Sequence, residues 1–131
     1  MKIMLDTNVI LDVWLAREPF WPDSASLLAR VERREIEGWI CPTTVTTLHY
    51  LAKKVLGEEK ARDLINRLIQ MCRVGEMSEE SICVALKSAL PDFEDAVIEA
   101  VSIESQVDLI ATRNLKHFRK SKVEAREPSK I

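Results

Sequence analysis

Glycine is scarce in this chain, with three in 131 residues. Loops that wrap backbone amides around a nucleotide phosphate need several closely spaced glycines, so a glycine-rich phosphate loop is not indicated. No pairing of serine, histidine and aspartate, or of cysteine and histidine, stands out either. His49 and His117 are isolated in the sequence. Chemistry that depends on a protein nucleophile is therefore not predicted.

Cysteine and long apolar runs are scarce as well. Cys41, Cys72 and Cys83 are odd in number and lack CxxC spacing, so we expect reduced cysteines in a cytoplasmic protein. Asp6 interrupts the first apolar run too early for a signal peptide. No run approaches the roughly 20 apolar residues of a membrane span. The length predicts a single domain over residues 1–131 with no membrane association.

The net charge of −2 is unevenly distributed. The segment from 113 to 130 contains seven bases and two acids, a local charge of +5, so the remaining residues carry −7. A basic segment beside an acidic pocket suits an enzyme that acts on a polyanion, because bases attract phosphates. Ordinary solvated surfaces show the same pattern. Charge alone therefore leaves both interpretations open.

Short apolar runs alternate with helical patterns along the chain. Strands are expected at 2–5, 38–41 and 107–111, with 73–77 as a strand or a turn and 122–124 as a last edge strand. Helices are expected at 9–15, from Asp23 or Ser24 to about residue 36, up to Gly57, at 58–72, at 78–90, and from Asp92 onward. The alternation predicts a three-layer α/β/α sandwich with a central parallel sheet.

The first acidic candidate, Asp6, directly follows the first strand. Ligands of open α/β sheets bind at the carboxyl ends of the strands, so this carboxylate is placed to hold a metal. The alternative is that it caps the following helix, a stabilisation of about 1 kcal/mol that needs no chemistry. Asn8 either orients Asp6 through a hydrogen bond or begins that helix.

Three acids, Asp92, Glu94 and Asp95, fall within four residues at a helix start. A helix dipole stabilises such acids by about 0.3–1 kcal/mol, but their mutual repulsion offsets the gain. A bound cation would relieve that repulsion, and hard oxygen donors suit Mg²⁺ or Mn²⁺. Glu99 lies one turn after Asp95 and either reaches the same site or belongs to a solvated helix face.

A polar turn, Thr112-Arg113-Asn114, follows the strand expected at 107–111. It either presents a hydroxyl, a guanidinium and an amide at the same sheet edge as Asp6 or forms a routine loop. Together with the two acidic segments it predicts a carboxylate-lined pocket. A metal held there would polarise a phosphodiester and activate water.

Three segments, LDTNVILD at 5–12, DFEDAV at 92–97 and DLIATRN at 108–114, occur in an order that resembles the PIN-domain family along nearly the whole chain. The resemblance implies a Rossmann-like α/β/α sandwich with metal-dependent ribonuclease activity. It also implies the toxin of a type II toxin–antitoxin pair, inhibited by a small antitoxin and usually dimeric. Two positions depart from the family: residues 44–49 lack its usual glutamate, and Asn114 replaces its usual aspartate.

The first functional hypothesis is a Mg²⁺- or Mn²⁺-dependent endoribonuclease of the toxin type. Its catalytic and metal-binding residues would be Asp6, Asp92 and Asp95. Glu94 or Glu99 would compensate for the missing acids.

Other residues are predicted to support this site. Asn8, Thr112 and Asn114 would position the acids or the scissile phosphate. Arg113 and Lys116 would hold the RNA backbone.

The second hypothesis is a PIN-like domain that has lost turnover and binds RNA or a protein. DNA-directed or phosphatase activity from the same metal pocket is a third. Expected partners are RNA, a small antitoxin and a second copy of the chain.

Overall fold

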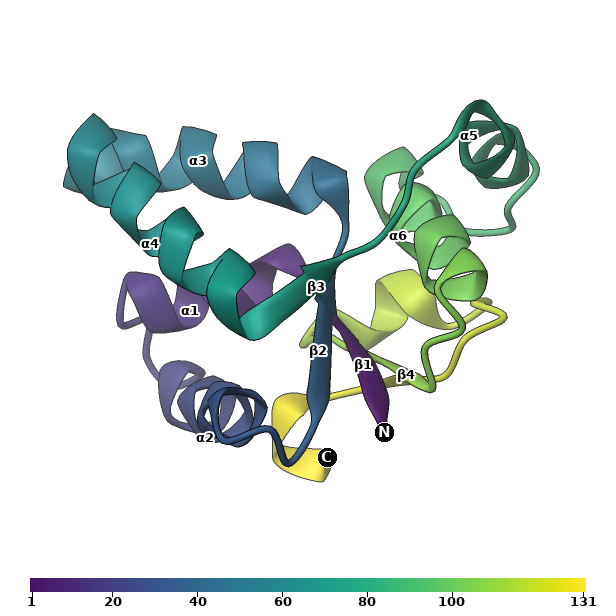
Figure 1. Cartoon of the computed structure of the whole chain (residues 1–131). Helices are drawn as coiled ribbons and strands as arrows, with labels where there is room; N and C mark the ends of the chain where they lie inside the picture. The colour runs from purple at the N-terminus through teal and green to yellow at the C-terminus, as the bar shows by residue number, and fades with distance from the viewer.

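The computed structural model describes residues 1–131 and contains one five-stranded sheet in which all neighbouring strands are parallel. The strands are β1 (Lys2–Leu5), β2 (Glu37–Ile40), β3 (Cys72–Val74), β4 (Leu109–Ala111) and β5 (Ala125–Arg126). Their order is β3-β2-β1-β4-β5. The chain thus adds β2 and β3 on one side of β1 and then crosses to the other side for β4 and β5 (Figure 1).

Helices cover both faces of the sheet (Figure 1). One face carries α1 (Thr7–Trp14), α2 (Trp21–Glu32), α3 (Pro42–Leu56) and α4 (Glu58–Met71). The other carries α5 (Glu79–Leu86), α6 (Phe93–Glu104) and the short 3₁₀ helix η1 (Leu115–Phe118). A second 3₁₀ helix, η2 (Pro128–Lys130), ends the chain. The predicted α/β/α sandwich is confirmed. None of the helices combines the length and the apolar character of a membrane span.

Alternation along β1 explains the two layers. Ile3 and Leu5 are fully buried with the helices of one face, whereas Met4 is fully buried with those of the other. Successive side chains of a strand point to opposite faces, so a strand that is apolar throughout must be covered on both sides. The central position of β1 therefore follows from its uninterrupted apolar sequence.

Several elements differ from the sequence-based expectation, among them α5, which is predicted at 78–90 but ends at Leu86 in the structure. The last strand is Ala125–Arg126, which directly follows the predicted segment 122–124, and pairs with β4. The second helix begins earlier, at Trp21, because proline is tolerated in the first turn, where Pro22 lies. It also ends earlier, at Glu32, and Ile36 is buried in the loop before β2.

All three cysteines are free. Cys41 and Cys72 are buried, and burial raises the pKa of the Cys72 thiol to about 12. These two side chains therefore stay protonated and act as core packing residues.

Candidate active site

The polar residues of interest lie where the strand order reverses. Asp6 follows β1 and Thr112 follows β4, and these two strands are neighbours at the centre of the sheet. The Asp6 backbone N–H continues the pairing by donating to the Ala111 carbonyl at 3.0 Å. A crevice at the carboxyl ends of strands on either side of a reversal is the usual ligand site of such sheets.

Asp6 is 4% exposed and accepts hydrogen bonds at both carboxyl oxygens. Oδ1 accepts from the Thr7 backbone N–H at 2.8 Å, so the side chain caps α1. Oδ2 accepts from Asn8 Nδ2 at 2.9 Å and from the Thr112 hydroxyl at 2.7 Å. The two alternatives for Asn8 and Asp6 are thus compatible: Asp6 caps its helix, and Asn8 and Thr112 fix the orientation of its carboxylate.

The second acidic segment starts α6. Asp92 is the N-cap residue, and its Oδ2 accepts from the Asp95 backbone N–H at 3.0 Å. Asp95 is 9% exposed, whereas Asp92 is exposed. The cap therefore presents one solvated and one nearly buried carboxylate at the same helix end.

Glu94 points from α6 towards α3. Its Oε1 accepts from the Thr47 hydroxyl at 3.3 Å. Thr47 belongs to the stretch 44–49, which lacks an acid of its own. A carboxylate is thus present beside this part of α3, although it comes from a different helix.

His117 is a site residue that sequence reasoning missed. It lies in η1, and its Nδ1 is 3.2 Å from Asp95 Oδ2. Its isolation in the sequence concealed this contact, because Asp95 is far away along the chain. The signal that could have found it is its position in the polar segment after β4, three residues beyond Asn114.

The pKa values of three of these acids are raised above their ordinary values. Burial, followed by the charges of Asp6 and Asp92, raises the pKa of Asp95 to about 6. Burial also raises the pKa of Glu94, and the charges of Asp92 and Asp6 add to this effect. Burial raises the pKa of Asp6 against its hydrogen bonds from Thr112, Thr7 and Asn8. These carboxylates therefore lie close enough to repel one another.

Three further predicted residues have different surroundings. The Asn114 backbone N–H donates to the Thr112 hydroxyl at 3.0 Å, which brings Asn114 to the edge of the site. Lys116 is exposed in η1 and forms no ion pair. Glu99 is 3% exposed, and its oxygens accept from the Ser88 hydroxyl at 2.7 Å and the Lys122 backbone N–H at 2.8 Å. Glu99 thus braces the segment after η1 and does not join the other acids.

Arg113, which the sequence predicts to hold RNA, is engaged in a structural ion pair. Its guanidinium contacts Asp12 with Nε 2.6 Å from Oδ2 and Nη2 3.1 Å from Oδ1. It also lies 4.3 Å from the centre of the Phe20 ring. Asp12 is fully buried, so the paired charge joins α1 to the loop after β4. The sequence could not reveal this because α1 carries the acid and the loop carries the base, 101 residues apart.

The donor chemistry of the site fits a hard divalent cation. Its carboxylates repel one another, and Mg²⁺ is usually held by one or two carboxylates with water completing its coordination. No three carboxylate, imidazole or thiol groups converge closely enough to enclose a metal ion by themselves. The fit is therefore to a hydrated ion with few protein ligands.

The profile of one protein family, described as the PIN domain, matches residues 2–116. The chain belongs to the PIN-domain family. The match covers the first acidic segment, the second acidic segment and the loop after β4, as the sequence motifs predicted. No curated protein is significantly similar in sequence.

Solved structures share the PIN fold of this chain. VapBC2 from Rickettsia felis, bound to a promoter DNA fragment, matches with a TM-score of 0.73 and 16% identity over 97% of this chain and 98% of that chain. VapBC-1 from nontypeable Haemophilus influenzae matches with a TM-score of 0.73 and 18% identity over 98% and 99%. VapC20 from Mycobacterium tuberculosis, a toxin that cleaves the sarcin–ricin loop, matches with a TM-score of 0.72 and 14% identity over 89% and 93%.

The buried ion pair of this PIN domain predicts the effect of Arg113→Met. The variant leaves the Asp12 carboxylate buried with only Arg17, 3.7 Å away, so the free energy of unfolding should fall by about 3 kcal/mol. Urea denaturation measures the change. The double variant Asp12→Leu/Arg113→Met should recover most of the loss, since it buries no unpaired charge. A fully stable single variant would contradict the structural role of Arg113.

The raised pKa of Asp95 predicts a pH-dependent stability in the absence of divalent ions. The folded chain binds the Asp95 proton more tightly than the unfolded chain does. The resulting stabilisation of the fold is complete below the ordinary aspartate pKa of 3.8 and is lost as the pH rises through about 6. Solvent screening limits it to about 1 kcal/mol. Urea denaturation in EDTA across this range should show a flatter profile for Asp95→Asn.

The exposed Asp23 of α2 provides the matched control. Asp23→Asn should keep the pH dependence of the unmodified chain. Asp6 and Glu94 contribute to that dependence in the same direction as Asp95, because burial raises their pKa values as well. Identical profiles for Asp95→Asn and Asp23→Asn would contradict the assignment.

Proposed function

We propose that the chain is a Mg²⁺- or Mn²⁺-dependent endoribonuclease and the toxin of a toxin–antitoxin pair. The observation that carries the proposal is the polar network at the strand-order reversal, in which Asn8 and Thr112 hold Asp6 and His117 contacts Asp95. The charges of Asp6 and Asp92 contribute to the raised pKa of Asp95. Membership of the PIN-domain family supports the proposal, as does the fold shared with a toxin that cleaves the sarcin–ricin loop.

In this proposal Asp6, Asp92 and Asp95 hold a hydrated cation, whose water molecules complete the coordination that these carboxylates do not supply by themselves. Glu94 adds negative charge beside Thr47. A bound Mg²⁺ or Mn²⁺ would supply polarisation of the phosphodiester and activation of water. Asn8 and Thr112 keep the Asp6 carboxylate in one orientation through their hydrogen bonds. His117 restrains Asp95 in the same way.

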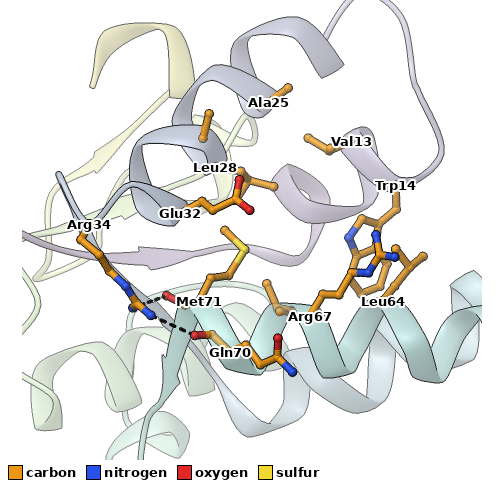
Figure 2. A pocket seen from close by; sticks show the side chains of 12 residues that line it. Val13, Trp14, Ala25, Leu28, Glu32, Arg34, Leu64, Arg67, Gln70 and Met71 are labelled. Carbon is orange, nitrogen blue, oxygen red and sulfur yellow. Dashed lines mark hydrogen bonds between the residues drawn. The ribbon is translucent and has the colours of Figure 1, made fainter.

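The proposed antitoxin contact is a largely apolar groove of about 520 Å³ between α1, α2 and α4 (Figure 2). Trp14, Leu28, Leu64 and Met71 are among the side chains that line it. On one edge, Arg34 donates to the backbone carbonyls of residues 70 and 71. An exposed, largely apolar groove of this size suits the apolar face of an amphipathic helix from a small partner protein. The homodimer stays a prediction.

The alternative is a binding module for RNA or protein that has lost turnover. The absence of an acid from residues 44–49, the presence of Asn114 and the lack of three converging ligands favour it. The two functions differ in one measurable property: only the nuclease cleaves RNA when a divalent ion is supplied.

Cleavage of labelled single-stranded RNA with Mn²⁺, Mg²⁺ or EDTA tests the proposal. Asp6→Asn and Asp95→Asn should each lower the metal-dependent rate by about 100-fold or more, because each removes a ligand. Asp23→Asn serves as the control and should cleave like the unmodified chain. Binding of RNA without cleavage in any metal would favour the alternative, and cleavage that survives both substitutions would place the site elsewhere.

A further role is predicted for Glu94. Glu94→Gln keeps the shape of the side chain and its capacity to accept from Thr47, but removes one charge beside the cation site. The Mn²⁺ concentration needed for half-maximal cleavage should rise by about 10-fold. The thermal shift caused by Mn²⁺ should fall in parallel. An unchanged Mn²⁺ dependence would exclude Glu94 from the site.

A further inference from the structure

A basic hollow of about 300 Å³ opens beside the acidic site. Its lining includes Pro91, Lys116, His117, Arg119 and Lys120. Two of its residues connect it to the acids: His117 contacts Asp95, and Pro91 directly precedes Asp92. The hollow therefore begins where the acidic site ends.

The cations of this hollow are free to bind a ligand. Lys116, Arg119 and Lys120 are exposed and take part in none of the ion pairs of the chain. No acid occurs between residues 113 and 123, so none is available locally to neutralise them. Arg113 and Arg126, on either side of this segment, are paired with Asp12 and Glu124. Unpaired positive charge is thus concentrated in the hollow itself.

A second hollow of about 280 Å³ continues the first. The two share Ala89 and Lys120, and the second adds Lys87 and Lys122, which also form no ion pair. Glu99 lies in the wall of the second hollow, but it is almost fully buried and both of its oxygens accept hydrogen bonds. The hollows together form a path of five exposed cations that leads away from the acids.

We propose that this path, which we call the basic groove (Lys87, Lys116, Arg119, Lys120 and Lys122), binds backbone phosphates of single-stranded RNA next to the scissile bond. The inference rests on the proposed nuclease function and assigns its substrate-binding surface. A strand whose scissile phosphate lies at Asp6 and Asp95 carries further phosphates on either side. The basic groove places cations without ion-pair partners next to the acidic site, where those phosphates would lie. Phosphate contacts of this kind position a strand without reading its sequence.

The experiment measures RNA binding without requiring cleavage. A short labelled single-stranded RNA is titrated in EDTA against the full chain carrying Asp6→Asn, at a series of salt concentrations. The test variant adds Lys116→Gln/Arg119→Gln/Lys120→Gln. The matched control adds Lys53→Gln/Lys54→Gln/Lys60→Gln, which removes the same charge from exposed positions at the junction of α3 and α4.

The groove variant should bind at least about 10-fold more weakly at low salt, and the slope of log affinity against log salt should fall by about 2, since each single-strand phosphate contact contributes about 0.7. The control should retain the original slope. Equal weakening of both triple variants, or undiminished binding by the groove variant, would overturn the proposal. Polyglutamate that competes as strongly as RNA would also overturn it, by assigning the groove to an acidic peptide.

This result separates the two proposals. If the chain with an intact Asp6 never cleaves RNA but its RNA binding still depends on Lys116, Arg119 and Lys120, the basic-groove proposal stands and the nuclease proposal is refuted. If the chain cleaves RNA in Mn²⁺ and its groove variant binds RNA normally, the nuclease proposal stands and the basic-groove proposal is refuted. Circular dichroism of each variant is the control for folding, and the exposed substitutions should leave the spectrum unchanged.

Discussion

The hydrogen bond from Thr112 to the buried Asp6 carboxylate is the interaction on which the site depends. At 2.7 Å it joins the residue after β1 to the residue after β4, across the reversal of strand order. A buried carboxylate without partners would be strongly destabilising, and here both oxygens have donors. The same carboxylate caps α1, so the start of that helix, the sheet edge and the acidic site share one anchor.

Two buried carboxylates of the chain differ in whether a positive charge neutralises them. Asp12 is fully buried and satisfied by Arg113, an arrangement that serves structure. Asp95 is nearly buried among like charges, with His117 as its only side-chain partner, and its pKa rises accordingly. Carboxylates that repel one another at a sheet edge weaken the fold unless a ligand neutralises them, and perturbed pKa values of this kind are typical of functional sites. A divalent cation is the simplest ligand that turns this repulsion into binding free energy.

The alternating pattern of the sequence was sufficient for the layers, the parallel sheet and the placement of Asp6, Asp95 and Thr112, because short apolar runs between helices have few ways to pack. Contacts between distant segments were beyond it. Arg113 and Glu99 carry the right charge at suitable positions, yet Asp12 and Ser88 determine where they point. His117 shows the converse, since an isolated histidine became a neighbour of Asp95 only through the path of η1. Helices and strands leave a periodic pattern in the sequence, whereas the partners of individual side chains do not.

The two surfaces proposed for partners lie on opposite faces of the sheet. The apolar groove is built from α1, α2 and α4, whereas the basic groove follows η1 and the end of α5. A partner confined to the apolar groove would therefore leave the cations free for RNA. It would still contact Val13 and Trp14 at the end of α1, the helix that Asp6 caps about 12 Å away. Inhibition by such a partner thus requires either an extension that reaches the acids or a displacement of α1 that disturbs Asp6. Because α1 joins the apolar groove to Asp6, a partner in that groove would affect the acidic site and not the binding of RNA to the basic groove.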